Sequence, residues 1–135
     1  MLTSLGIDII EVDRIREGMR RWPQLAARLF TERERAYCEQ KADPALHYAA
    51  RFAAKEATAK AVGRWLRWHE VEVLSDAHNR PLLQLVGESA QVARIAEGAR
   101  LLVSLSHCRD YAAAVVACVM PTSPRGEESA PGVWV

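Results

Sequence analysis

An acidic residue in an otherwise apolar N-terminal segment is the first candidate for chemistry. Asp8 is flanked by Gly6-Ile7 and Ile9-Ile10, and these β-branched neighbours favour a strand. A buried carboxylate without a partner is costly, so Asp8 would need a cation, a hydrogen-bond network or solvent at a sheet edge. A solvent-facing acid on a half-exposed strand explains the pattern equally well, and the segment alone leaves both interpretations open.

Glu56 and Lys60 form a second candidate group. They are four residues apart in a predicted helix, so they share one face of it. Glutamate before lysine at this spacing is also the commonest surface ion pair, worth only ~0.3–0.5 kcal/mol. Lys55 lies beside Glu56, and the surrounding small side chains would let another element or a ligand approach the helix closely. These are Ala53, Ala54, Ala57, Ala59 and Ala61.

A third group lies at the end of a predicted strand. Alternation sends Ser104 and Ser106 to one face, with His107 at the strand end, where polar residues often reach a site. A hydrogen-bonded turn histidine is the simpler alternative. A serine-protease-like triad is not supported, because the sequence has no Gly-x-Ser-x-Gly elbow.

The residue types favour a hard cation over zinc. Carboxylate oxygens suit Mg²⁺, which takes one or two protein carboxylates and shares its other positions with phosphate and water. A lysine one turn from such a carboxylate can meet a phosphate oxygen. The three groups together indicate phosphate-ester or pyrophosphate chemistry, although spacing cannot show that they converge in space.

The first half of the chain is predicted to be a strand followed by helices. A strand over 5–12 precedes a helix over 13–21. Thr31 and Glu34 have the spacing of a capping box, which starts a helix reaching about residue 40. Asp43-Pro44 signals another helix start, and the alanine-rich stretch 45–62 is the strongest helix prediction, with Gly63 as its natural end.

The second half is predicted to be mainly strands. Alternation and turn chemistry indicate strands over 70–74 and 82–86, then a helix over 88–97 closed by Gly98. Two apolar strands follow, over 101–106 and 112–120. The expected fold is therefore α+β, a single domain with one long helix packed on antiparallel strands.

Composition narrows the class of protein. The 135 residues fit one domain, placed at 1–120, and residues 121–135 are predicted to be a disordered tail rich in proline and glycine. The formal net charge of +1 does not indicate a broad nucleic-acid surface. No apolar run approaches the ~20 residues of a membrane span, and the N-terminus lacks the basic region of a signal peptide. Three widely spaced cysteines indicate free thiols, so we expect a cytoplasmic protein with neither membrane nor nucleic-acid partners.

Three segments in this order strongly resemble the holo-(acyl-carrier-protein) synthase family of 4′-phosphopantetheinyl transferases. They are Gly6 to Ile15, Arg51 to Ala57 with Lys60 to Gly63, and Ser104 to His107. The similarity covers about residues 3–120. It implies transfer of 4′-phosphopantetheine from coenzyme A to a serine of an apo acyl carrier protein, with release of adenosine 3′,5′-bisphosphate, in support of fatty-acid or polyketide synthesis.

The resemblance also implies roles for individual residues. Asp8 and Glu56 would bind Mg²⁺, Lys60 would stabilise charge on the phosphates, and Glu56 would help to remove the serine proton. Five residues would contact coenzyme A, namely Arg51, Lys60, Gly63, Ser106 and His107. Arg14, Arg20 and Arg21 would dock the acidic carrier protein, although a solvated basic face explains them as well. The assembly would be a homotrimer with active sites between subunits.

Some positions depart from the family pattern. Gly63 is followed by Arg64 and Trp65 where a Gly-x-Gly-like turn is common, Arg80 stands where glycine is frequent, and Cys108 follows His107. These departures affect the expected coenzyme A pocket rather than the metal pair. They keep open a non-catalytic module that binds coenzyme A or a carrier protein on the same fold. A ligand-free structural trimer is a third reading, and it leaves Asp8 unexplained.

Overall fold

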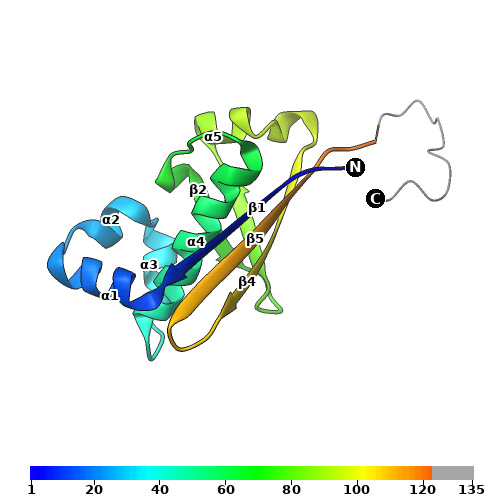
Figure 1. The fold of residues 1–135 in the computed structure, drawn as a ribbon. Helices are drawn as coiled ribbons and strands as arrows, with labels where there is room; N and C mark the ends of the chain where they lie inside the picture. The colour runs from blue at the N-terminus through cyan, green and yellow to red at the C-terminus, as the bar shows by residue number, and fades with distance from the viewer. Residues whose placement is uncertain (123–135) are drawn as a thin grey trace.

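A three-stranded antiparallel sheet covered on one face by a long helix forms the centre of the protein (Figure 1). The computed structural model describes residues 1–122. The sheet has the order β1-β5-β4, from β1 (Leu2–Glu11), β5 (Tyr111–Val119) and β4 (Arg100–His107). The helix is α4 (Pro44–Val62). The predicted α+β class is confirmed.

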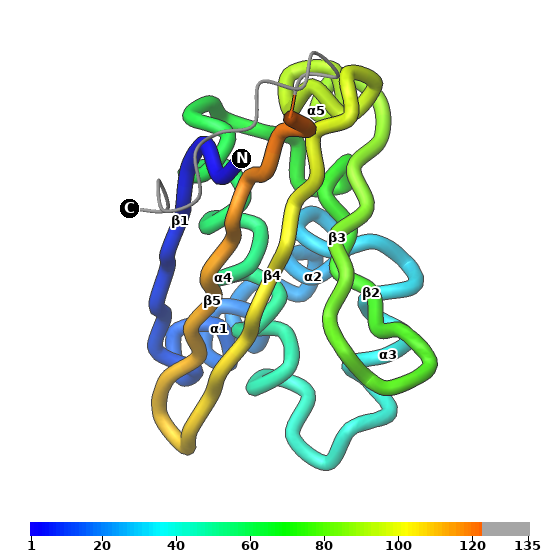
Figure 2. The backbone as a smooth tube through the Cα atoms, turned by 90° about the vertical axis from the view of Figure 1, so that its right-hand side faces the viewer, coloured from blue at the N-terminus to red at the C-terminus, as the bar shows by residue number. Residues whose placement is uncertain are grey.

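A separate hairpin and several short helices surround this centre. The hairpin, β2 (Val71–Ser75) with β3 (Pro81–Leu85), lies beside β4 (Figure 2). Helices α1 (Val12–Arg21), α2 (Leu25–Leu29) and α3 (Glu32–Glu39) gather at one end. The remaining helical segments are α5 (Gly87–Val92) and the 3₁₀ turns η1 (Trp68–Glu70) and η2 (Ile95–Glu97).

The predicted helix boundaries are largely confirmed. Thr31 and Glu34 form the complete capping box of α3. Helix α4 starts with Pro44 in its first turn and ends at Gly63, whose φ of 82° is left-handed and needs no strain in glycine. The Asp43 carboxylate before this helix binds Arg16, at 2.8 and 3.1 Å.

The helix predicted over 88–97 is wrong as a single element. Arg94 has a φ of 62°, a left-handed conformation that ends a helix, so the segment divides into α5 and η2. The short α2 was not predicted, because five residues are too few to establish a helical period. The disordered tail predicted over 121–135 falls, from residue 123 onward, outside the described residues.

Strand β1 lies directly on the alanine-rich face of α4. A Cβ atom on Gly6 would lie 1.9 Å from the carbonyl oxygen of Ala57 and 2.7 Å from the amide nitrogen of Ala61. The hydroxyl of Ser4 donates a hydrogen bond to the carbonyl of Ala61. The predicted close approach to the small residues of this helix is therefore made by β1, backbone against backbone.

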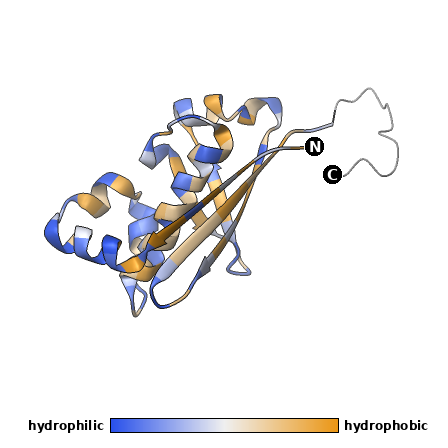
Figure 3. Cartoon of the chain, viewed as in Figure 1, coloured by the Kyte–Doolittle hydropathy of each residue, from blue (hydrophilic) through white to orange (hydrophobic). Residues whose placement is uncertain are grey.

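The opposite face of the sheet is apolar and uncovered. Leu5, Ile7 and Ile9 are 61%, 66% and 65% exposed, and Leu102 and Val115 extend the same surface across β4 and β5. Figure 3 shows the apolar character of these strands. We call this surface, made by these five residues, the outer face. Within residues 1–122, none of the helices is long and apolar enough to cross a membrane.

The contact at Gly6 predicts a large effect of a single methyl group. Gly6→Ala should lower the free energy of unfolding by about 2–3 kcal/mol, because strand or helix backbone must move to admit the Cβ. Urea unfolding followed by circular dichroism measures this. The matched control is Gly18→Ala in α1, where the added Cβ meets only the end of the Leu25 side chain and alanine is the better helix former. Equal stability of Gly6→Ala and wild type would contradict the close contact.

Candidate functional site

Asp8 faces α4, where it meets the side chain of Lys60. Gly6, Asp8 and Ile10 alternate onto the inner face of the sheet, so the close contact at Gly6 brings the Asp8 carboxylate to the helix. The Lys60 ammonium lies 3.1 Å from Asp8 Oδ1 and donates to the carbonyl of Ile7 at 2.9 Å. Among the described residues Lys60 has no ion pair with Glu56, so the simple surface pair expected from their spacing does not form.

Glu56 is electrostatically coupled to the same group. Its pKa is raised above the ordinary value, first by burial and then by the negative charge of Asp8, while Lys60 acts in the opposite direction. The Asp8 side chain is only 17% exposed. Two carboxylates and one ammonium thus share a partly buried position between β1 and the C-terminal half of α4. We call Asp8 and Glu56 the acidic pair, and Lys60 is the lysine beside it.

The acidic pair has a donor set that fits Mg²⁺. Both ligands are carboxylates, and the mutual repulsion of their charges is relieved by a cation. Among residues 1–122, no three histidine, cysteine, aspartate or glutamate side chains converge. A protein cage of the zinc type is thus not formed there, whereas a cation completed by phosphate and water oxygens can be held by Asp8 and Glu56.

A second group of predicted residues lies around the N-terminal half of α4. Arg51 is only 4% exposed, its guanidinium lies 4.0 Å from the centre of the Tyr37 ring, and its Nε has no hydrogen-bond partner. The rings of His47 and His107 are 5.9 Å apart. The pKa of His47 is lowered by burial and then by Arg51, His107 and Lys41. We call Lys41, His47, Arg51 and His107 the cationic cluster.

Within one chain, the predicted site residues therefore do not form a single group. Asp8, Glu56 and Lys60 come together, and Gly63 ends the helix one turn after Lys60. Arg51 and His107 belong to the cationic cluster, which is built on the first turns of α4. Ser106 lies on the side of β4 that belongs to the outer face, turned away from α4.

The three predicted docking arginines lie on α1 and are exposed. Arg20 pairs with Glu17, and the Arg21 guanidinium lies 5.8 Å from the ring centre of Trp22. Arg14 has no ion pair among residues 1–122. Next to them is an open groove of about 650 Å³, whose lining includes Trp22 and Leu25. Positive charge beside an apolar groove suits an acidic partner with an apolar side chain.

Sequence reasoning missed a buried ion pair behind Glu56. Lys55 Nζ lies 2.7 Å from Glu34 Oε1, and both side chains are almost fully buried. The ammonium also donates to the carbonyls of Trp68 and Val71, at 2.7 and 2.6 Å. Burial lowers the pKa of Lys55, and Glu34 opposes this shift. The pair fixes α4 to α3 and β2, and so fixes the direction in which the next residue, Glu56, points.

Lys55 gave only a weak signal in the sequence. It stood beside Glu56 in a charged stretch, where a solvated lysine is the usual finding. Glu34 already had a role in the capping box of α3, and its carboxylate serves both purposes by accepting from the amides of Thr31 and Val73 as well. The sequence did not show that one carboxylate would do both.

Comparison with known proteins identifies the family of this chain. Residues 4–116 match the family model described as the 4′-phosphopantetheinyl transferase superfamily. The chain belongs to this superfamily. The resemblance based on the three segments is thereby confirmed, and so is the assignment to a family of transferases.

Named relatives span nearly the whole chain. The holo-(acyl-carrier-protein) synthase of Moorella thermoacetica is 44% identical over 117 residues, covering 84% of this chain and 91% of that protein. The synthase of Geobacter sulfurreducens is 43% identical over 129 residues and is covered completely.

Solved structures of this family share the fold. The Neisseria meningitidis synthase aligns with a TM-score of 0.78 at 30% identity, covering 88% of this chain and 99% of that one. The Bacillus anthracis synthase, in complex with coenzyme A (3′,5′-ADP), aligns with a TM-score of 0.72 at 31% identity, covering 87% and 96%.

The raised pKa of Glu56 predicts that its ionised carboxylate lowers the stability of the metal-free protein. A carboxyl group whose pKa is raised in the folded state favours folding below its ordinary pKa of 4.5, and this contribution is lost as the pH rises through the folded value. At pH 8 the ionised Glu56 therefore destabilises the metal-free protein. Glu56→Gln should raise the melting temperature at pH 8, and the gain should shrink towards pH 4.

Thermal unfolding in the presence of a chelator measures this difference. The control is Glu97→Gln, which removes an exposed carboxylate paired with Arg94 and should bring no gain at pH 8. Addition of Mg²⁺ should then stabilise wild type more than Glu56→Gln, because a bound ligand stabilises only the state that holds it. A melting temperature for Glu56→Gln at or below wild type at pH 8 would contradict the coupling of the two carboxylates.

Proposed function

We propose that this chain transfers 4′-phosphopantetheine from coenzyme A to a serine of an acyl carrier protein, as a Mg²⁺-dependent holo-(acyl-carrier-protein) synthase. The observation that carries the proposal is the meeting of Asp8, Glu56 and Lys60 between β1 and α4. A carboxylate pair for a hard cation and an adjoining ammonium for phosphate oxygens are the parts that phosphoryl transfer requires.

Asp8, Glu56 and Lys60 have separate proposed roles in the reaction. Asp8 and Glu56 would hold Mg²⁺, which supplies charge neutralisation at the pyrophosphate of coenzyme A. Lys60 is 54% exposed, so its ammonium can turn from Asp8 towards a phosphate oxygen as charge develops. Glu56, whose pKa is raised by burial and by Asp8, accepts the serine proton directly or through a water. The serine oxygen attacks the β-phosphorus, and adenosine 3′,5′-bisphosphate leaves.

The cationic cluster suits the adenosine end of coenzyme A. Lys41 and Arg51 bring positive charge close to the ring of His47, and the buried Arg51 retains an unused Nε donor. Phosphate oxygens would both satisfy this donor and neutralise the cluster. Ser106 and Gly63 are proposed to contact the same substrate, Ser106 from the end of β4 and Gly63 beside Lys60.

We further propose a homotrimer in which each active site lies between two subunits. The outer face presents large apolar side chains that a monomer would leave in water. In one chain the acidic pair lies on the inner side of the sheet, whereas Ser106 lies on the other side and His107 at the far end of α4. Packing outer faces around a threefold axis buries the apolar residues and can bring His107 of one subunit to Asp8 of the next.

The exposed arginines of α1 are proposed as the docking surface for the carrier protein. Arg14, Arg20 and Arg21 would steer an acidic partner, while the groove at Trp22 receives an apolar side chain. We place the reaction in the cytoplasm, where the holo carriers would serve fatty-acid or polyketide synthesis.

The transfer itself is tested by weighing the carrier protein. Incubation with coenzyme A, Mg²⁺ and a panel of apo acyl carrier proteins should increase the mass of at least one carrier by one phosphopantetheine. Asp8→Ala and Glu56→Gln should each lower the rate at least about 100-fold. Each variant removes a carboxylate that would hold the Mg²⁺ ion, and this ion would neutralise the charge of the pyrophosphate. Glu97→Gln, far from the acidic pair in the sequence and exposed, is the matched control.

The alternative of a non-catalytic binding module is distinguished in the same assay. Binding of coenzyme A without any mass gain across the whole panel would favour the module over the enzyme. Wild-type rates in both Asp8→Ala and Glu56→Gln would remove these residues from the site.

Mixed oligomers test the shared active site. Asp8→Ala and His107→Ala should each be inactive, yet a 1:1 mixture refolded together should regain about a quarter of the wild-type activity, because some interfaces combine an intact Asp8 with an intact His107. Mixing without refolding is the control for exchange. No recovery in a mixture that sedimentation shows to be trimeric would place both residues in one chain's site.

A further inference from the structure

The ammonium of Lys60 is bound to the carboxylate that the proposed metal site requires. It lies 3.1 Å from Asp8 Oδ1 and donates to the carbonyl oxygen of Ile7 at 2.9 Å, so two acceptors of β1 hold it. Glu56 belongs to the same group, since Asp8 and Lys60 shift its pKa in opposite directions. Lys60 is thus the counterion of Asp8 in this arrangement.

A bound metal ion and the Lys60 ammonium compete for Asp8. Mg²⁺ binds carboxylate oxygens at about 2.0–2.1 Å. With both cations on one carboxylate, like charges would lie within about 4 Å of each other, a distance at which repulsion is large in a partly buried position. The Asp8 side chain is only 17% exposed, so water screens this repulsion poorly. Binding of either cation at Asp8 therefore weakens the binding of the other.

Lys60 can leave Asp8, whereas Lys55 on the same helix is fixed. The Lys60 side chain is 54% exposed, and its ammonium ends a flexible four-carbon stem. An ion pair with this exposure contributes little to stability, so breaking it costs little. Lys55 is almost fully buried and is held by Glu34 and two backbone carbonyls. The lysine of α4 that can move is thus the one beside the acidic pair.

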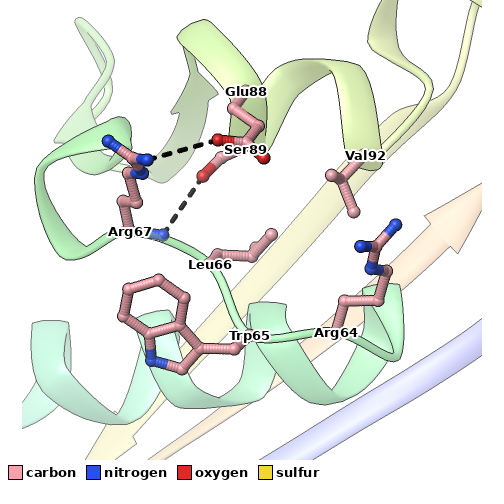
Figure 4. Close-up of a pocket in the computed structure, with 7 residues that line it drawn as sticks. All are labelled: Arg64, Trp65, Leu66, Arg67, Glu88, Ser89 and Val92. Carbon is pink, nitrogen blue, oxygen red and sulfur yellow. Dashed lines mark hydrogen bonds and ion pairs between the residues drawn. The ribbon is translucent and has the colours of Figure 1, made fainter.

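Two further cations follow the helix, and neither of them is paired with Asp8. Arg64 and Arg67 line a pocket of about 300 Å³ between the turn after α4 and α5 (Figure 4). Arg67 is directed to Glu88, 3.4 Å away, and Arg64 lies on the other side of the pocket (Figure 4). Within residues 1–122, Lys60 is therefore the cation that Asp8 pairs with.

We propose that Lys60 is a mobile counterion, which leaves Asp8 when a divalent cation binds there and moves to the phosphates of coenzyme A. The inference rests on the proposed function, because it takes Asp8 as a ligand of Mg²⁺ and the pyrophosphate as the neighbour of Lys60. Each ligand then helps the other to bind. The cation releases Lys60 for the phosphates, the phosphates draw Lys60 away from Asp8, and the two effects are equal in size.

Binding of Mn²⁺ without coenzyme A tests the competition. Mn²⁺ takes the same oxygen ligands as Mg²⁺, and the free ion is counted by electron paramagnetic resonance. Lys60→Met keeps the apolar stem and removes the charge, so it should bind Mn²⁺ at least about fivefold more tightly than wild type. Lys60→Arg keeps the charge and should stay closer to wild type, and Asp8→Asn should lose the ion.

Arg64→Met is the matched control for the loss of one positive charge. Arg64 lies near the same end of α4 but has no contact with Asp8, so this variant should change the affinity for Mn²⁺ less than about twofold.

The same titration with saturating coenzyme A tests the coupling. Coenzyme A should tighten Mn²⁺ binding in wild type, and the gain should be at least about fivefold smaller in Lys60→Met, which has no ammonium to move. A direct contact between the ion and the pyrophosphate would contribute to the gain in both proteins. The difference between the two gains therefore isolates the contribution of Lys60.

Two results overturn the inference. They are equal or weaker Mn²⁺ binding in folded Lys60→Met, and an equal gain from coenzyme A in Lys60→Met and wild type. Circular dichroism establishes folding, and Lys60→Gln repeats the test with a second neutral side chain. These titrations contain no carrier protein and need no turnover. A failure to load any carrier would refute the proposed transferase, whereas Mn²⁺ binding alone decides the role of Lys60 as a counterion.

Discussion

The contact between the backbone of β1 at Gly6 and the backbone of α4 at Ala57 and Ala61 sets the position of the candidate catalytic groups. Strand and helix meet with no side chain between them, a distance that only glycine and alanine allow. Two residues later on the strand, Asp8 reaches the level of Lys60. A side chain at position 6 would move the strand, and with it the Asp8 carboxylate, away from the helix. Gly6 therefore determines the position of Asp8.

The charges of α4 are sorted by the face of the helix on which they lie. Lys55 is withdrawn completely into the protein, where Glu34 and two backbone carbonyls satisfy it. The next residue, Glu56, turns towards β1 and stays accessible, with its pKa raised by burial and by Asp8. Lys55 thus stabilises the fold, whereas its neighbour Glu56 stays accessible at the candidate site. The buried pair adds rigidity, because breaking it would leave an uncompensated charge, and this rigidity holds the Glu56 carboxylate in place.

The sheet has two different faces, and this difference bears on assembly. Its inner face is filled by α4, whereas its outer face leaves apolar side chains of β1, β4 and β5 exposed. The same division separates the acidic pair from Ser106, and the cationic cluster lies at the other end of the helix. The exposed apolar face and the separation of these groups within one chain are the two observations on which the proposed homotrimer rests.

The sequence by itself predicted most of the helices and strands and named the candidate reactive residues. The capping box at Thr31, the long alanine-rich helix and its end at Gly63 follow from local preferences that act over a few residues, and all are confirmed. The division of the segment after Gly87 was missed, because a non-glycine residue at positive φ, here Arg94, gives no sequence signal. The match of Gly6 to Asp8 and Arg51 to Ala57 with a family indicated the chemistry before any distance was known.

Only the tertiary structure decided which charges meet. By spacing, Lys60 was the partner of Glu56, yet the approach of β1 gives it Asp8, 52 residues away in the chain. Lys55 pairs with Glu34 for the same reason, since the packing of α3 against α4 is not encoded in any local pattern. Charge pairs depend on distances across the fold, and those distances are set by side-chain volume at contacts such as Gly6, which a linear pattern records only as a glycine.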